Sequence, residues 1–277
     1  MLKFIGGTNY INVSIFIKTL YNGCITPIID YAKESSKTKY DVIKYNKETT
    51  SLVEHINKNH YNKDIAYACK LTSYLSYNHE VNIDNFIKKI INTSHPNKYI
   101  YFDSENTYLR DKENYIFDKI IEKYQDIDNL HIFKTYQMYK KNSFNEIQKD
   151  LKKFDKIGIK LVRGAYYSKY DDELYQNKKE TDTNYDNAIK YLINNTNNKI
   201  CLATHNKKSI NYSLSLKPND NVMYAQLLGM GDDLTMKLLD NNKKVFKYIP
   251  YGSILDTYPY LLRRLYENIG IIKHIYK

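Results

Sequence analysis

The sequence predicts an α/β protein with the (β/α)8 architecture of a TIM-type barrel. Three observations support this fold. Short apolar runs recur along the chain, segments with helical periodicity lie between them, and each run ends in a polar residue suited to binding or chemistry. Buried parallel strands read as short continuous apolar runs that are joined by helices. A doubly wound open sheet is less favoured, because no glycine-rich phosphate loop follows the first run.

The expected strands are the apolar runs that are bounded by turn residues or by a helical pattern. In chain order they are 24–30, 66–70, 99–103, 131–136, 157–163, 199–204, 222–226 and 245–249. Helical periodicity between them is clearest in four segments, where apolar residues recur at spacings of three and four. These segments are 83–91, 115–124, 144–154 and 185–193. The whole chain, 1–277, is expected to form one barrel domain, with its core over about 20–270.

A last helix is expected after the final strand, in the stretch PYLLRRLYEN (259–268). Pro259 suits the first turn of a helix, and Asp256 or Thr257 is a suitable cap. The leucines at 261, 262 and 265 lie on other sides of this helix from its arginines and are expected to anchor it in the barrel.

The charge of the chain is high but dispersed. With 42 Lys plus Arg against 31 Asp plus Glu, the net charge is +11. Such a charge fits an anionic partner, such as nucleic acid, a membrane surface or a nucleotide cofactor. The lysines are nevertheless scattered, and no RNA-binding motif or zinc-finger spacing occurs. A solvated basic surface is therefore the preferred interpretation, and no nucleic acid partner is expected.

Cysteines and hydropathy indicate a reducing compartment. Cys24, Cys69 and Cys201 are odd in number, far apart and set in or beside apolar runs, so we expect buried free thiols. No run of 18 apolar residues occurs, and no signal-peptide or transit-peptide pattern opens the chain.

A barrel places catalytic residues at the carboxyl ends of its strands. Strand ends usually carry polar turn residues, but here all eight carry groups able to bind a ligand or do chemistry. In order they are Asp30, Lys70, Asp103, Gln137, Lys160 with Arg163, Thr204-His205-Asn206, Gln226 and Tyr248. No second His stands at metal-ligand spacing from His205, so no metal site is predicted.

Arginine is rare in this lysine-rich chain, and its four copies stand at 110, 163, 263 and 264. On a helix, Arg263 and Arg264 share a face with Tyr260 and Glu267. Two guanidinium forks side by side can grip a carboxylate in a bidentate way, which Lys cannot do. An exposed Arg–Glu surface pair is the simpler explanation, but the scarcity of Arg elsewhere favours the anion-binding one.

Five motifs, taken in this order and spacing, resemble the proline dehydrogenase family, and its eukaryotic single-function branch in particular. They are KLVRGAYY (160–167), CLATHN (201–206), YAQLLGMGDD (224–233), KYIPYG (247–252) and YLLRRLYEN (260–268). Weaker agreement comes from CITPIIDYAKE (24–34), CKLTS (69–73), YFDSENTY (101–108) and TYQMY (135–139). The resemblance implies a barrel that uses FAD to oxidise L-proline to Δ1-pyrroline-5-carboxylate, with electrons passing to a quinone-type acceptor.

The resemblance also implies roles for individual residues. For the substrate, Arg263 and Arg264 with Lys70 would hold the carboxylate, Tyr248, Tyr260 and Leu228 would line the ring, and Asp103 and Glu267 would supply acids. For the cofactor, the matching positions are Gln137, Lys160, Arg163, Gly164, Tyr166, Thr204, His205, Asn206 and Gln226. The residue Tyr248 favours proline over hydroxyproline, because a related branch that prefers hydroxyproline differs there.

Partners and location follow in the same way. The family analogy indicates mitochondria and a peripheral membrane contact, whereas the sequence alone indicates a cytoplasmic protein. Two other functions remain open: a catalytically degenerate barrel that acts as a binding protein, and a flavoenzyme acting on hydroxyproline.

Overall fold

The computed structural model describes residues 4–33, 36–59, 62–75, 77–105, 110–165 and 168–267, with the backbone alone for Tyr260 and residues 263–267. Eight parallel strands close into a barrel in chain order, and β1 pairs with both β2 and β8. The open-sheet alternative is therefore wrong. The strands are β1 (Thr26–Tyr31), β2 (Ile65–Lys70), β3 (Lys98–Asp103), β4 (Leu130–Gln137), β5 (Gly158–Val162), β6 (Ile200–Ala203), β7 (Val222–Leu227) and β8 (Lys244–Tyr251).

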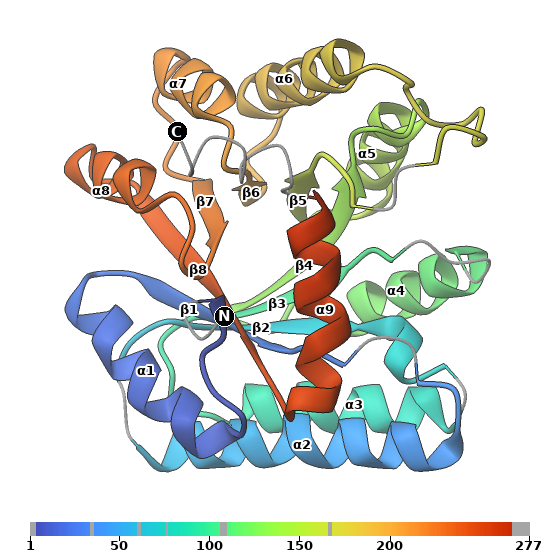
Figure 1. Ribbon diagram of the computed structural model, residues 1–277. Helices are drawn as coiled ribbons and strands as arrows, with labels where there is room; N and C mark the ends of the chain where they lie inside the picture. The colour runs from blue at the N-terminus through green and yellow to red at the C-terminus, as the bar shows by residue number, and fades with distance from the viewer. Residues whose placement is uncertain are drawn as a thin grey trace.

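Helices surround the strands in Figure 1, as helical connections between parallel strands require. They are α1 (Tyr10–Asn22), α2 (Lys39–Lys58), α3 (His79–Ile91), α4 (Arg110–Tyr124), α5 (Ser143–Lys153), α6 (Lys178–Asn195), α7 (Lys207–Ser215) and α8 (Asp232–Asp240). A short 3-10 turn, η2 (Leu71–Ser73), follows β2. The four predicted helices correspond to α3, α4, α5 and α6.

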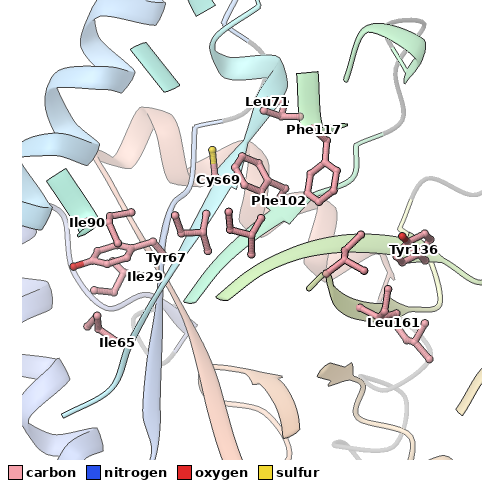
Figure 2. Close-up of a cluster of buried hydrophobic side chains, with 14 of the residues drawn as sticks. Ile29, Ile65, Tyr67, Cys69, Leu71, Ile90, Phe102, Phe117, Tyr136 and Leu161 are labelled. Atoms are coloured by element: carbon pink, nitrogen blue, oxygen red, sulfur yellow. The ribbon is translucent and has the colours of Figure 1, made fainter. Parts of the chain in front are cut away.

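Two cores result from the alternation of side chains along the strands. The outer core lies between strands and helices and includes Ile29, Tyr67 and Phe102, which Figure 2 shows in one cluster. The inner core fills the barrel and includes Tyr99, Tyr101 and Phe133. Because both faces of every strand are buried, the strands carry the continuous apolar runs seen in the sequence.

The last helix, α9 (Ile254–Glu267), begins earlier than the sequence indicates. Its cap is Ser253, which exchanges hydrogen bonds with Asp256, so neither Asp256 nor Thr257 is the cap. Pro259 therefore lies inside the helix and not in its first turn. Leu262 is 43% exposed, which contradicts its expected anchoring role. Asp256 ties the start of α9 to β1 and α2, by accepting hydrogen bonds from Tyr31 at 3.0 Å and Lys44 at 2.9 Å.

One cysteine also differs from expectation. Cys69 and Cys201 are buried free thiols, but Cys24 is exposed. It lies in the turn between α1 and β1 with a φ of 57°, before the strand enters the barrel. Apolar neighbours in the sequence therefore gave the wrong burial for this residue. Among the described residues, no helix is both long and apolar enough to span a bilayer.

Candidate active site at the carboxyl end of the barrel

Three predicted residues meet at the carboxyl end of the barrel axis. The Lys160 ammonium on β5 donates to Asp103 Oδ1 on β3 at 2.6 Å and to the Tyr248 hydroxyl on β8 at 2.5 Å. The Tyr248 hydroxyl in turn donates to Asp103 Oδ1 at 3.0 Å. We call this set the Lys160 triad. Its members come from three strands, so the closed barrel is what assembles them.

Burial controls the electrostatics of the triad. Lys160 is 4% exposed and Tyr248 is 6% exposed. Burial, followed by the nearby Asp103 carboxylate, raises the pKa of Tyr248 well above its usual value, so its hydroxyl keeps its proton at neutral pH. The ammonium also lies 4.6 Å from the Tyr248 ring centroid and 5.9 Å from that of Tyr101. The site thus presents a fixed cation above two aromatic rings.

Lys70 forms a second buried ion pair beside the triad. Its ammonium bonds to the Asp30 carboxylate and donates to the Tyr31 carbonyl oxygen at 2.9 Å. Both Lys70 and Asp30 are 3% exposed. Because β2 pairs with β3 so that Lys70 faces Asp103 across the ladder, the two ion pairs share one end of the barrel. The triad and this pair together bring five of the strand-end residues that the sequence singled out to one end of the barrel.

Arg163 is fixed at the end of β5 by three hydrogen bonds. It donates to Asp182 at 2.6 Å, to the Thr204 hydroxyl at 2.7 Å and to Ser209 at 2.8 Å. Its guanidinium also stacks 4.4 Å from the Tyr185 ring centroid. The hydrogen bonds from Lys178 and Arg163 outweigh the effect of burial and lower the pKa of Asp182. Arg163 therefore holds the turn after β5 against α6 and α7.

The motif 203–206 has clear structural roles. The Thr204 hydroxyl also accepts the Asn206 amide at 3.0 Å, and the Asn206 side chain caps α7 by accepting two amides. His205 Nε2 accepts the Leu227 amide at 3.1 Å, which places the proton of the neutral ring on Nδ1. These contacts join the ends of β6 and β7 and set the direction of the His205 ring.

Gly231 opens a cradle beside this ring. A Cβ at Gly231 would lie 2.9 Å from His205 Nδ1 and 3.5 Å from Gln226 Nε2, and the residue has a φ of +65°. Gln226 is 2% exposed, and Thr235 donates to its Oε1 at 2.5 Å. Its Nε2 is buried without a hydrogen bond among the described residues. A buried amide without an acceptor is costly, so this cradle suits a ligand with acceptor oxygens.

Gly164 serves packing within the protein. It has a φ of +128°, and a Cβ there would lie 1.3 Å from the Tyr139 ring. Gln137 is 3% exposed, donates to the Ser104 carbonyl at 3.0 Å and accepts from the Tyr139 hydroxyl at 3.4 Å. Leu228 is buried, with its amide bonded to the Tyr248 carbonyl at 3.0 Å. Gln137 and Leu228 are thus bonded to the backbone next to Asp103 and at Tyr248, respectively.

Part of the predicted site is not described in side-chain detail. Tyr166 lies outside the described residues. Tyr260, Arg263, Arg264 and Glu267 lie on the backbone of α9, so their predicted helix is confirmed. The sequence did not single out Tyr101 and Asp182. Tyr101 lies two residues before Asp103 on one strand, so strand alternation was a usable signal, whereas nothing local connects Asp182 to Arg163.

The closed barrel and the polar cluster at the carboxyl ends of its strands define a (β/α)8 protein with the site geometry of enzymes of this architecture. Comparison with known families is more specific. The family model described as proline dehydrogenase matches residues 16–275, and the chain belongs to that family.

The sequence relatives agree. The chain is 30% identical over 200 residues to proline dehydrogenase 1, mitochondrial, of Dictyostelium discoideum. The matched region covers 62% of this chain and 35% of that protein. The chain is 29% identical over 195 residues to the human protein of the same name, with 62% and 32% covered. Hydroxyproline dehydrogenase of Xenopus laevis is 30% identical over 171 residues, with 53% and 37% covered. The chain thus spans about a third of the length of these relatives.

The structural neighbours share the fold. Proline utilization A from Bdellovibrio bacteriovorus, inactivated by N-propargylglycine, superposes with a TM-score of 0.84 at 20% identity, over 96% of this chain and 32% of that one. A variant of proline utilization A from Bradyrhizobium japonicum gives a TM-score of 0.79 at 19% identity, over 97% and 31%.

Proposed function

We propose that this protein oxidises L-proline to Δ1-pyrroline-5-carboxylate with FAD as cofactor, and that a quinone-type acceptor takes the electrons. The observation that carries the proposal is the Lys160 triad at the carboxyl end of a barrel whose family is proline dehydrogenase. Bound FAD would supply the hydride acceptor, and the protein would bind, orient and polarise.

The cradle at Gly231 fits a cofactor that carries acceptor oxygens. The Gln226 Nε2 group is buried without an acceptor among the described residues, and the His205 ring is fixed beside it. Lys160 and Gln137 would hold the cofactor from the neighbouring strand ends. Gly164, Thr204 and Asn206 would shape the backbone around it, since their own contacts fix the turns after β5 and β6. Arg163 would set the position of these turns through its three hydrogen bonds.

On the substrate side, we propose that Arg263 and Arg264 grip the proline carboxylate, with Lys70 adding positive potential from the strand below. A planar fork matches a carboxylate in geometry and charge. The ring would pack against Tyr248, Tyr260 and Leu228, and Glu267 would orient the arginines. The Tyr248 hydroxyl is already engaged by Lys160 and Asp103, so it offers little to a ring hydroxyl. We therefore propose proline over hydroxyproline.

The test is a visible spectrum of the purified protein with FAD, before and after L-proline is added without oxygen. We expect a flavin spectrum that bleaches with L-proline and much less with hydroxyproline. Arg263→Met and Arg264→Met should bleach only at much higher proline concentration. A flavin spectrum that ignores both amino acids would overturn the substrate, and failure to bind FAD at all would favour a degenerate barrel that acts as a binding protein.

A further inference from the structure

The helix α9 is held on the barrel by polar contacts and has no broad apolar face that is buried. Of its described side chains, at 254–259, 261 and 262, only that of Thr257 is buried, and Leu255 is 86% exposed. A surface helix is usually held by an apolar stripe that faces the core. Because α9 carries the two arginines that are proposed to bind the substrate carboxylate, whatever fixes this helix also fixes them.

Asp256, in the first turn of α9, makes the contacts that join this helix to other elements. Its Oδ2 accepts hydrogen bonds from the Tyr31 hydroxyl on β1 at 3.0 Å and from the Lys44 ammonium on α2 at 2.9 Å. Its Oδ1 lies 3.9 Å from the Lys33 ammonium, and its side chain is only 9% exposed. Figure 1 shows the start of α9 (red) next to α2 (blue). The Ser253 bond is internal to the turn, whereas these contacts fix the turn to the barrel.

Packing holds the Tyr31 ring in place. Tyr31 is 3% exposed, and its ring centroid lies 5.3 Å from that of Tyr251 and 5.5 Å from that of Tyr45. A Cβ at Gly252, which has a φ of +144°, would lie 3.0 Å from the Tyr31 ring. Burial, followed by the Asp256 carboxylate, raises the pKa of Tyr31, so the hydroxyl keeps its proton at neutral pH. Tyr31 is therefore a fixed donor, and its bond to Asp256 fixes the start of α9.

The same tyrosine also positions Lys70. The Tyr31 carbonyl oxygen accepts a hydrogen bond from the Lys70 ammonium at 2.9 Å, and Lys70 pairs with Asp30, the residue before Tyr31. Lys70 and the two arginines of α9 are the three cations proposed to act on the substrate carboxylate. One residue of β1 therefore holds Lys70 through its carbonyl oxygen and α9 through its hydroxyl.

We propose that Tyr31 and Asp256 are positioning residues, which set the spacing between Lys70 and the arginines of α9 and thereby the affinity for the substrate carboxylate. This inference rests on the proposed function. Arg263 lies seven residues after Asp256, about 10 Å farther along the helix, so a small tilt at Asp256 displaces it. A bidentate bond between guanidinium and carboxylate needs a defined geometry, so such a displacement weakens binding. The anchor thus acts on binding and not on the transfer of hydride.

The rate of flavin bleaching without oxygen, measured against L-proline concentration, separates binding from chemistry. Tyr31→Phe removes only the hydroxyl, and Asp256→Asn removes the charge. We expect each to raise the proline concentration at half-maximal rate about three- to tenfold, as one weakened hydrogen bond predicts, and to change the rate at saturation less than about twofold. The double variant should resemble Asp256→Asn, because both changes break the same bond. Tyr251→Phe is the matched control, since its buried hydroxyl contacts the Glu48 carbonyl and should leave both values unchanged.

Two ring compounds show whether the effect is confined to the carboxylate. Cyclopentanecarboxylate keeps the five-membered ring and the carboxylate but has no amine, whereas pyrrolidine keeps the ring and the amine but has no carboxylate. Binding of each to the FAD-loaded protein is measured by the change in flavin absorbance. We expect Tyr31→Phe and Asp256→Asn to weaken cyclopentanecarboxylate binding about three- to tenfold and to leave pyrrolidine binding unchanged. A general disturbance of the fold would not distinguish the two compounds.

Two results would overturn the positioning role. One is a lower urea midpoint in Tyr31→Phe and Asp256→Asn with unchanged proline and cyclopentanecarboxylate binding, which would make the anchor purely structural. The other is a loss confined to the rate at saturating proline. Failure of the proposed function is seen separately, in the natural protein, if L-proline does not bleach its flavin.

Discussion

Asp103→Asn is the sharpest perturbation of the Lys160 triad. The amide keeps the size of the side chain and an oxygen that can accept, but it removes the negative charge. Lys160, which is 4% exposed, would then keep its ammonium buried without the carboxylate that now lies 2.6 Å away. We expect this change to destabilise the whole barrel, because the pair joins β3 to β5 across the interior.

The size of the loss can be worked from the geometry. Removing one partner of a buried ion pair costs about 3–5 kcal/mol, since the remaining charge stays desolvated. The Asp103 side chain is 20% exposed and the amide oxygen still accepts, so we take the lower end, about 3 kcal/mol. That corresponds to roughly a 150-fold change in the folding equilibrium.

Urea denaturation at neutral pH measures this loss. Asp126→Asn is the control, because Asp126 pairs with Lys156 at 3.3 Å with side chains that are 82% and 63% exposed. That exposed pair should contribute less than about 0.5 kcal/mol. Adding Lys160→Met to Asp103→Asn should restore much of the stability, since it removes the buried charge. A loss below about 1 kcal/mol for Asp103→Asn, or no recovery in the double variant, would refute the reasoning.

Three further predictions concern the rest of the barrel. Gly164→Ala should lower the free energy of unfolding in urea by more than about 3 kcal/mol, because the new Cβ would lie 1.3 Å from the Tyr139 ring at a φ of +128°. Gly23→Ala is the control and should be nearly neutral, because a Cβ there meets only ordinary contacts beyond 3.4 Å. Equal losses in the two variants would contradict this account. Arg163→Lys should cost about 2 kcal/mol, because one ammonium cannot reproduce donations to three separate partners; a neutral result would show that the fork is dispensable. Burial, followed by Lys199 and Lys244, lowers the pKa of His131 to about 4. As the pH falls, the His131 ring therefore becomes protonated in the unfolded chain before it does so in the folded one. The contribution of His131 to the free energy of unfolding is therefore complete above about pH 6.5 and is lost as the pH falls toward 4. Between pH 7 and pH 5 the free energy of unfolding of the natural protein should fall by about 1 kcal/mol more than that of His131→Asn, after allowance for the partial exposure of the ring. Equal falls in the two proteins would contradict this prediction.

Much of the fold could be predicted because the strands are buried on both faces. The expected run 66–70 corresponds to β2 at Ile65–Lys70, and 99–103 corresponds to β3 at Lys98–Asp103. The C-terminal helix was placed too late, because Pro259 was read as a start signal. The Ser253-to-Asp256 spacing, which is a capping pattern, was the better signal.

The candidate site divides in the same way. The barrel rule placed Asp103, Lys160 and Tyr248 at strand ends, which is a property of position along the chain. The bonds among them join residues 57, 88 and 145 positions apart, and no local pattern specifies which strand end bonds to which. The attachment of Arg163 to Asp182, and the exposure of Cys24, were likewise beyond the sequence pattern.

The sequence by itself determined the alternation of strands and helices, and hence the end of the barrel at which polar residues gather. Periodicity and burial are properties of neighbouring residues, so they can be seen in the chain before it folds. The tertiary structure decided the partners of each charge, the cradle at Gly231 and the anchor of α9 at Asp256. These depend on the closure of the barrel and on where each strand ends relative to its neighbour, and such distances exist only after distant segments have packed together.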